Sequence, residues 1–229
     1  IFAHNFGDVN HRTVQGDTVP SLASRVKHAL GIKNNFCVAY DLIFGCPGWI
    51  EGVIQANAFI KSGIASRCLI IGAETLSRVI DVHDRDSMIY ADGAGAVIIE
   101  SSNDGTGILS HLSASHTYRE KDYLFFGKSY NSESSTQTRY IKMNGRRIYE
   151  FAISNVPAAM KKCYDSSGLP IDNLKKIIIH QANEKMDEEI VRRFYALYDK
   201  AMPENIMPMV ISKLGNSSVA TIPTLLSMI

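Results

Sequence analysis

Cys46 stands at a turn whose composition would favour a reactive cysteine. The apolar run 36–42 predicts a buried strand, and Gly45-Cys46-Pro47-Gly48 then turns into an almost wholly apolar helix. Proline suits the first helical position, because its missing N–H would have no intrahelical partner there. Cys46 would then be the N-cap, where unpaired N–H groups and the positive end of the helix dipole favour a thiolate. The alternative is that Cys46 is a small buried apolar residue.

Two further residues have types and positions that could serve chemistry. His180 ends the run Ile177–His180, which predicts a buried strand, and α/β proteins place ligands beyond the carboxyl ends of their strands. A histidine satisfied within the core is the plainer explanation. Asn216 lies in Lys-Leu-Gly-Asn-Ser-Ser before a helix, where turn and capping chemistry would already explain it.

The glycine-rich segment 92–96, Asp-Gly-Ala-Gly-Ala, resembles a phosphate-binding loop. Such a loop should open a helix, whereas this one leads into the apolar strand predicted for 94–100. We therefore interpret its glycines as positions of close backbone packing.

Composition is that of an ordinary soluble globular protein. The 229 residues include 45% hydrophobic and 21% charged side chains, with a net charge of +1. This charge gives no argument for binding nucleic acid or a membrane surface. The four cysteines are far apart, which argues against a metal site or a disulfide framework and favours a reducing, cytosolic setting. No window approaches the 18 apolar residues of a membrane span.

The predicted elements alternate between strand and helix, which indicates an α/β fold. In the first part, strands are expected at 1–4, 36–42, 67–72 (buried and parallel) and 94–100, and helices at 19–30 (capped by residue 17 or 18) and 47–62. After a turn-rich boundary at 101–106, we expect strands at 107–115 and 177–180 and helices at 144–165, 184–198 and 217–229. Pro157 should kink or split its helix, and Pro223 should interrupt the last one.

This order predicts two similar halves, 1–104 and 105–229. The chain opens in a strand-like run and stops in a helical pattern, so we expect a piece of a longer polypeptide that is truncated at both ends.

Five segments together indicate a family that none indicates alone. In chain order they are GCPGW (45–49), DGAGAVIIE (92–100), KMNGRRIYEFAI (142–153), IIIHQAN (177–183) and GNSSVATIP (215–223). They resemble the beta-ketoacyl-acyl carrier protein synthase III family, which has the thiolase-like layered αβαβα fold. The likeness covers nearly the whole chain.

The resemblance implies a Cys-His-Asn triad at Cys46, His180 and Asn216. Cys46 would take an acyl group from acyl-CoA, and malonyl-acyl carrier protein would then enter. His180 and Asn216 would hydrogen-bond its thioester carbonyl and stabilise the enolate formed as carbon dioxide leaves. Attack on acyl-Cys46 would give a beta-ketoacyl product for fatty acid biosynthesis, with no cofactor besides the substrates. The N–H of Cys46 would supply half of the oxyanion hole for the acyl group.

The resemblance also implies substrate-binding positions. Arg85 matches an arginine that packs against the CoA adenine. Lys185 matches a basic residue that helps dock acidic acyl carrier protein, and Arg146 could add to this positive rim with Arg147 and Lys142. Val19 takes the place of a phenylalanine that closes the acyl pocket of acetyl-selective members, which favours a longer or branched primer. A homodimer is expected, with 36–42 pairing across its two-fold axis.

Two departures from the family pattern leave alternatives open. Pro47 replaces the small residue that usually follows the cysteine, and Ala91 replaces the first glycine of GDGAGA. The protein could be a specialised condensing enzyme of the alkylresorcinol or polyketide type, or a non-catalytic partner subunit. A cysteine hydrolase would need a carboxylate near His180, for which Glu184 is a candidate.

Overall fold

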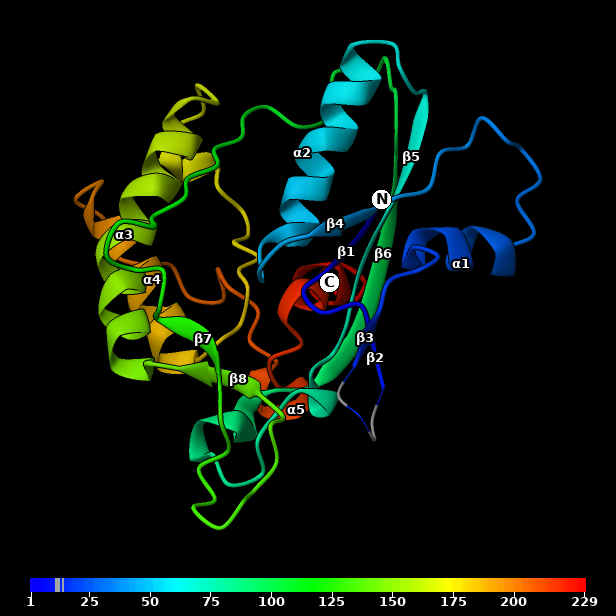
Figure 1. The fold of residues 1–229 in the computed structure, drawn as a ribbon. Coiled ribbons are helices and arrows are strands. Elements are labelled where there is room, and N and C mark those ends of the chain that lie inside the picture. Colours follow the sequence, from blue (N-terminus) through cyan, green and yellow to red (C-terminus); the bar gives the residue numbers. More distant parts are fainter. Residues whose placement is uncertain (11–12, 14) are drawn as a thin grey trace. The chain divides into compact units, whose positions relative to one another are not determined.

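The computed structural model describes residues 1–10, 13 and 15–229, and it is a mixed α/β protein (Figure 1). The chain forms two compact units. The first unit contains Ile1–Val79, Tyr90–Thr106 and Ser217–Ile229, and the second contains Ile80–Ile89 and Gly107–Asn216. The sequence halves 1–104 and 105–229 stay a prediction.

The first unit is built on a four-stranded sheet in the order β4-β1-β5-β6. Its strands are β1 (Phe2–His4), β4 (Asp41–Ile43), β5 (Arg67–Thr75) and β6 (Asp92–Glu100). β1 pairs in parallel with β4 and β5, whereas β5 and β6 are antiparallel over nine residue pairs. The prediction that 67–72 is a parallel strand is therefore confirmed for its pairing with β1 and wrong for its pairing with β6.

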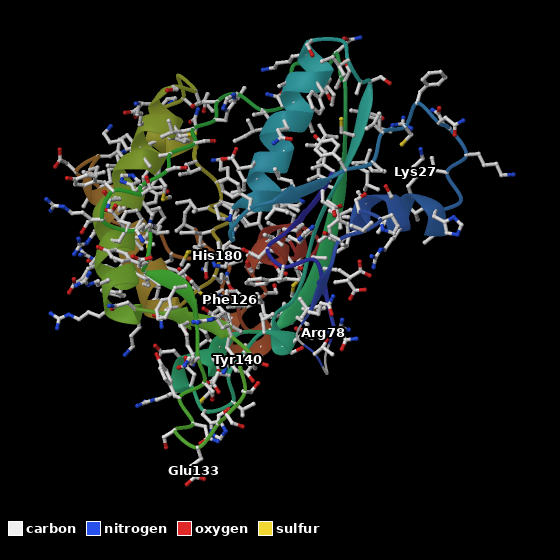
Figure 2. All side chains as sticks on the ribbon, viewed as in Figure 1. Lys27, Arg78, Phe126, Glu133, Tyr140 and His180 are labelled. Atoms are coloured by element: carbon white, nitrogen blue, oxygen red, sulfur yellow. The ribbon has the colours of Figure 1, made fainter. Side chains whose placement is uncertain are left out.

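Three helices and a small hairpin complete the first unit. The helices are α1 (Leu22–Ala29), α2 (Gly48–Lys61) and α6 (Thr221–Leu226), the last preceded by the 3-10 turn η4 (Ser218–Ala220). Figure 1 shows α1 and α2 on opposite sides of the sheet. The hairpin joins β2 (Asp8–Val9) and β3 (Gly16–Asp17), and Arg78 (Figure 2), in the 3-10 turn η1 (Leu76–Arg78), donates to the Val9 carbonyl at 2.7 Å.

Three glycines of the sheet allow the segment 217–224 to lie directly on it. A Cβ on Gly72 would overlap the Val219 carbonyl oxygen and would lie 3.1 Å from Trp49 of α2. A Cβ on Gly95, the partner of Gly72 in the ladder, would lie 2.8 Å from the Thr224 nitrogen, and one on Gly93 would lie 2.8 Å from Ser217 Cβ. The glycines of 92–96 therefore serve close packing, as predicted.

Replacing Gly72 by alanine is expected to lower the free energy of unfolding by about 1–3 kcal/mol, because the new methyl group meets backbone that must move. Denaturant unfolding would measure the change. Gly145→Ala is the matched control, since its Cβ would lie 3.6 Å from an Asp86 carboxylate oxygen, at ordinary contact distance. Equal stability of the two variants would contradict the packing account.

The second unit combines a β-hairpin with a pair of long helices. Its strands are β7 (Leu124–Gly127) and β8 (Tyr140–Met143), which are antiparallel. Its helices are α3 (Gly145–Asp165), α4 (Glu184–Ala196) and α5 (Ile211–Leu214), with 3-10 turns η2 (Arg85–Ile89) and η3 (Ile171–Asn173). Three buried side chains of α4 form a hydrophobic core with Ile177 and Ile206. They are Val191, Phe194 and Tyr195.

Neither proline interrupts the helix in which it lies, so the predicted split at Pro157 and interruption at Pro223 are wrong, and the alternative of a kink at Pro157 stays a prediction. Pro157 lies inside the continuous helix α3, where it leaves the Ile153 carbonyl without its usual donor, and the Arg193 guanidinium donates to that oxygen at 3.1 Å. Pro223 lies in the first turn of α6, where a backbone N–H has no intrahelical partner.

Three predicted strands differ from the structure. In the run 36–42 only 41 and 42 enter β4, and the side chains of Phe36 and Val38 are 94% and 74% exposed. The runs 107–115 and 177–180 form no strand in the described chain, although Ile177 donates to the Ile206 carbonyl at 2.9 Å. Strands need a paired neighbour for their backbone groups, and apolar composition alone does not supply one.

The first helix also begins later than predicted. Ser21, rather than residue 17 or 18, caps α1 by accepting from the Ser24 N–H. The Asp41 carboxylate accepts from the N–H groups of Leu22 and Ala23 at 2.9 and 2.8 Å, which ties the helix start to β4. Among the described residues, no helix is both long enough and apolar enough to cross a bilayer.

Candidate functional site

Cys46 lies half-buried in the tight turn between β4 and α2. The Gly48 N–H donates to the Gly45 carbonyl at 2.8 Å and closes this turn. Pro47 is the N-cap residue and α2 begins at Gly48, so Cys46 precedes the cap by one residue, which corrects the predicted cap position. The thiol nevertheless belongs to the N-terminal end of a 14-residue helix, the end that favours negative charge.

Three polar side chains of the first unit form a connected chain of hydrogen bonds to Cys46. The Ser218 hydroxyl donates to Cys46 Sγ at 3.3 Å, and Asn5 Nδ2 donates to Ser218 Oγ at 3.0 Å. Both Asn5 Nδ2 and the Asn5 backbone N–H donate to Glu74 Oε2, the latter at 2.8 Å. Burial raises the pKa of Glu74, and the hydrogen bonds from Asn5 oppose this rise.

The roles of Glu74, Asn5 and Ser218 were not foreseen from the sequence. One signal was present, because Glu74 is a charged residue that continues the apolar run 67–72, and only 5% of it is exposed. Charged residues are almost never fully buried unless they have partners. Nothing local in the sequence marks Asn5, or Ser218 in the helix expected at 217–229, because their hydrogen bond joins residues 213 positions apart.

His180 and Asn216 belong to the second unit, and Cys46 belongs to the first. Their assembly into one triad therefore stays a prediction. Figure 2 labels His180, which is followed by the fully buried Gln181. Gln181 donates to the Pro208 carbonyl at 2.6 Å and accepts from the Val210 N–H at 2.9 Å, while Asn183 caps α4.

Gln181 and Asn183 therefore anchor the segment that follows His180. Asn216 is fixed separately. Asn216 is 3% exposed, follows Gly215 at φ 67°, and donates its N–H to the Ile89 carbonyl at 2.7 Å.

A buried carboxyl group near His180 was not foreseen. Asp187 of α4 is 1% exposed, and burial raises its pKa to about 7, although the positive charge of a protonated His180 would lower it. Glu184, the carboxylate proposed from sequence, is exposed at the start of α4. Asp187 is therefore a buried carboxyl group that interacts electrostatically with His180.

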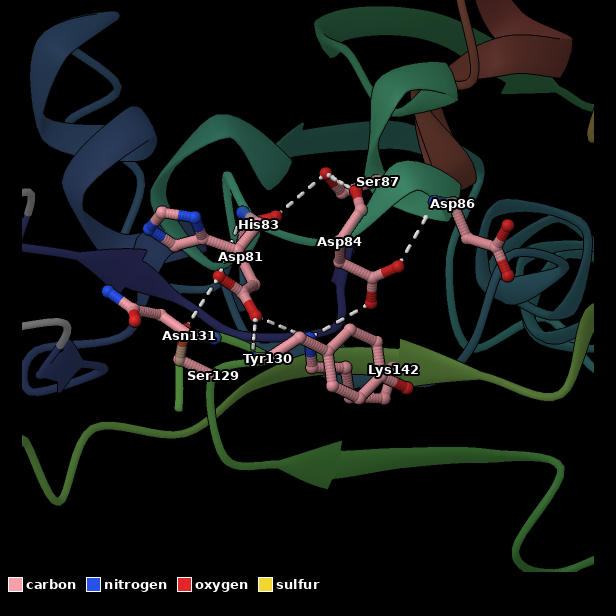
Figure 3. A network of polar contacts seen from close by, with 9 residues as sticks. All are labelled: Asp81, His83, Asp84, Asp86, Ser87, Ser129, Tyr130, Asn131 and Lys142. Atoms are coloured by element: carbon pink, nitrogen blue, oxygen red, sulfur yellow. Dashed lines mark hydrogen bonds and ion pairs between the residues drawn. The ribbon is translucent and has the colours of Figure 1, made fainter. Parts of the chain in front are cut away.

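Lys142 occupies the centre of a buried ionic network (Figure 3). Its Nζ lies 2.6 Å from Asp81 Oδ2 and 2.9 Å from Asp84 Oδ2, and 3.6 Å from the centroid of the Tyr130 ring. Burial acts to raise the pKa of Asp81, but the Lys142 ammonium and the Tyr130 N–H outweigh it and hold that pKa well below its usual range. Lys142 is 1% exposed, so its predicted place on a positive rim is wrong.

This ionic network fixes the segment that carries Arg85. Asp81, Asp84 and Ser87 point inward, and the Ser87 hydroxyl lies within hydrogen-bonding distance of the carbonyls of Asp81 and Asp84. Arg85, at the start of η2, is exposed between them. The geometry therefore holds Arg85 at the surface, and its contact with CoA stays a prediction.

The remaining predicted substrate residues are all at the surface of their own units. Val19 is 85% exposed, Lys185 is exposed in the first turn of α4, and the Arg146 side chain pairs with Glu150 at 2.9 Å. The four cysteines, all within the described residues, form no disulfide. The described residues contain no group of three or more His, Cys, Asp or Glu side chains arranged to hold a metal ion.

Comparison with known sequences gives one consistent family. Residues 40–116 match the family model described as 3-oxoacyl-[acyl-carrier-protein (ACP)] synthase III. The chain is 34% identical over 220 residues to beta-ketoacyl-[acyl-carrier-protein] synthase III of Streptococcus gordonii, and 35% identical over 214 residues to that of Ehrlichia canis. These matches cover 94% and 92% of this chain but only 65% and 63% of the relatives.

Solved structures agree with the sequence matches. The synthase III of Thermus thermophilus superposes with a TM-score of 0.82 at 29% identity, over 99% of this chain and 66% of that one. The enzyme of Aquifex aeolicus gives 0.80 at 28% identity, over 94% and 64%. The structure is therefore a partial thiolase-like fold. The chain belongs to the beta-ketoacyl-[acyl-carrier-protein] synthase III family.

Proposed function

We propose that the full-length protein catalyses a decarboxylating Claisen condensation between an acyl-CoA primer and malonyl-acyl carrier protein. The observation that carries the proposal is the thiol of Cys46, which lies at the N-terminal end of α2 and accepts a hydrogen bond from Ser218. Both features stabilise a thiolate, which is the nucleophilic form of cysteine. Family membership supports acyl-CoA and malonyl-acyl carrier protein as the substrates. It also supports a role in fatty acid biosynthesis in the cytoplasm.

In the first step, the Cys46 thiolate attacks the thioester carbonyl of acyl-CoA. A new carbon–sulfur bond forms to Cys46, and the CoA sulfur leaves with its electron pair and takes up a proton. The oxyanion of the tetrahedral intermediate needs hydrogen-bond donors, and the Cys46 N–H would be one of them. The product of this half-reaction is acyl-Cys46 and free CoA.

In the second step, His180 and Asn216 would donate hydrogen bonds to the thioester carbonyl of malonyl-acyl carrier protein. The carbon–carbon bond to the malonyl carboxylate breaks and carbon dioxide leaves. The electron pair of that bond stays on the thioester and forms the enolate that these donors stabilise. The enolate carbon then attacks the acyl-Cys46 carbonyl and expels the Cys46 thiolate. Neutral donors suit this step, because negative charge develops on the oxygen that they contact.

The exposed residues support the accompanying assignments. Arg85 would stack on the CoA adenine, Lys185 and Arg146 would face acyl carrier protein, and Val19 would border the acyl pocket. The exposure of the apolar side chains of Phe36 and Val38 supports a homodimer in which this segment is covered by the partner. The layered αβαβα arrangement of two similar halves belongs to the same proposal.

A cysteine hydrolase is the second candidate, because Asp187 supplies the buried carboxyl group near His180 that a base-orienting role would use. A specialised condensing enzyme would share the triad but use another primer, and a non-catalytic partner subunit would form no acyl-enzyme.

The deciding experiment follows products of the full-length protein with a panel of acyl-CoAs, with and without malonyl-acyl carrier protein. The proposal expects carbon dioxide and beta-ketoacyl-acyl carrier protein only when both substrates are present. Free carboxylic acid released without malonyl-acyl carrier protein would favour the hydrolase. Absence of any product with every primer would favour the non-catalytic subunit.

A further inference from the structure

We propose that Glu74, Asn5 and Ser218 form a relay of hydrogen bonds that aims the Ser218 hydroxyl proton at the Cys46 sulfur and so activates the thiol. The inference rests on the proposed role of Cys46 as nucleophile. It assigns three positioning residues, each with one task, and none of them needs to touch the substrate.

Glu74 sets the orientation of the Asn5 side chain. The backbone N–H and the side-chain nitrogen of Asn5 both donate to the same oxygen, Glu74 Oε2. With the amide reversed, Asn5 Oδ1 would face this carboxyl oxygen, and two acceptors would repel each other. Glu74 is 5% exposed, so water does not compete freely for the position. The Asn5 amide is therefore fixed with its nitrogen towards Glu74.

The orientation of Asn5 in turn sets the direction of the Ser218 hydroxyl. The second N–H of Asn5 Nδ2 points to Ser218 Oγ at 3.0 Å. An amide nitrogen only donates, so the hydroxyl oxygen must accept, and its own proton is left for another acceptor. That acceptor is Cys46 Sγ, at 3.3 Å. A hydrogen bond to sulfur is stronger when the sulfur is ionised, so the contact favours the thiolate.

The backbone holds Ser218 in a conformation that it would not adopt by preference. Ser218 has φ 52°, in the left-handed region where glycine is favoured, yet it carries a side chain that is 4% exposed. Gly72 and Gly93 let the adjoining residues Val219 and Ser217 lie on the sheet at this point. Glycine would adopt this backbone conformation without strain, and serine differs from it by the side chain that carries the hydroxyl group. Backbone strain of this kind is typical of functional sites.

The test is the pH dependence of Cys46 alkylation by iodoacetamide in the full-length protein, read by mass spectrometry of the peptide that contains Cys46. Ser218→Ala and Ser218→Gly both remove the hydroxyl, and glycine also relieves the backbone. We expect both to shift the half-maximal pH of alkylation upward by about one unit, and to slow alkylation below that pH by about tenfold. Asn5→Ala should shift it in the same direction by less, since the Ser218 hydroxyl can then rotate.

Two controls separate the relay from a structural effect. Ser217→Ala removes the neighbouring hydroxyl, which contacts Thr221 Oγ1 at 3.4 Å, and should leave the profile unchanged. Glu74→Gln keeps an acceptor for Asn5 and should retain the wild-type profile, whereas Glu74→Ala should resemble Asn5→Ala.

The relay is overturned if Ser218→Gly alkylates with the wild-type profile, or if Ser217→Ala shifts it as far. Because alkylation requires no acyl substrate, a shifted profile supports the relay even where no condensation is detected. A normal profile in an active Ser218→Gly enzyme would reject the relay and leave the proposed function standing.

Discussion

A His180→Ala variant is expected to accept an acyl group at Cys46 and then to lose about 10²–10³ in the rate of condensation. His180 would donate to the carbonyl oxygen of malonyl-acyl carrier protein, which gains negative charge only in the second half-reaction. Gln181 and Asn183 hold the surrounding segment through their own contacts, so the loss should be local. Intact-protein mass would follow acylation, and product mass would follow condensation.

The matched control for this variant is His28→Ala, an exposed histidine in α1. It should leave both half-reactions at wild-type rates. Wild-type condensation by His180→Ala would contradict the assigned role, and failure of its acylation would indicate that His180 acts on Cys46 as a base.

A Lys142→Met variant is expected to lose about 3–5 kcal/mol of unfolding free energy at pH 7. Methionine fills a similar volume, but it leaves the buried carboxylates of Asp81 and Asp84 without their shared cation. Denaturant unfolding would measure the loss. Lys121→Met is the control, because Lys121 pairs with Asp122 at 2.8 Å on the surface and an exposed pair contributes at most about 1 kcal/mol.

The same variant should show a characteristic pH dependence. Lys142 holds the pKa of Asp81 well below its usual range, so this interaction stabilises the wild type above the ordinary aspartate pKa of about 3.9. That contribution is lost as the pH falls through the lowered pKa of the folded protein. The gap between wild type and Lys142→Met should therefore narrow as the pH falls below about 4. A constant gap down to pH 3 would show that packing, not charge, is responsible.

Helices were the elements best predicted from sequence, because their signals are local. The helix expected at 47–62 is α2 within one residue at each end, and Asn144 and Asn183 supply ordinary caps for α3 and α4. Pro157 does not split α3, because the Ile153 carbonyl accepts a hydrogen bond from the guanidinium of Arg193, 36 positions away from Pro157 in sequence.

Strands were harder to predict, because a strand depends on a neighbour that sequence does not identify. Of the apolar run 36–42 only residues 41 and 42 enter a strand, and the run 107–115 enters none among the described residues. The two glycines of 92–96 were understood correctly as packing positions, although their partner segment 217–224 was not foreseen.

The candidate site likewise contains one residue that local sequence predicts and others that depend on distant contacts. Cys46 stands out locally, because glycine and proline around it indicate a turn into a helix. The residues that act on it, Asn5, Glu74 and Ser218, come from three distant parts of the chain. Lys142 was assigned to the surface because a lysine usually lies there, and only the inward positions of Asp81 and Asp84 explain its burial.

The most direct test of the account is the intact mass of the full-length protein after incubation with a panel of acyl-CoAs, beside a Cys46→Ala variant. The account predicts a mass increase of one acyl group that is absent from Cys46→Ala and disappears when malonyl-acyl carrier protein is added. An acyl adduct that persists in Cys46→Ala, or a complete lack of adduct with every primer, would contradict it.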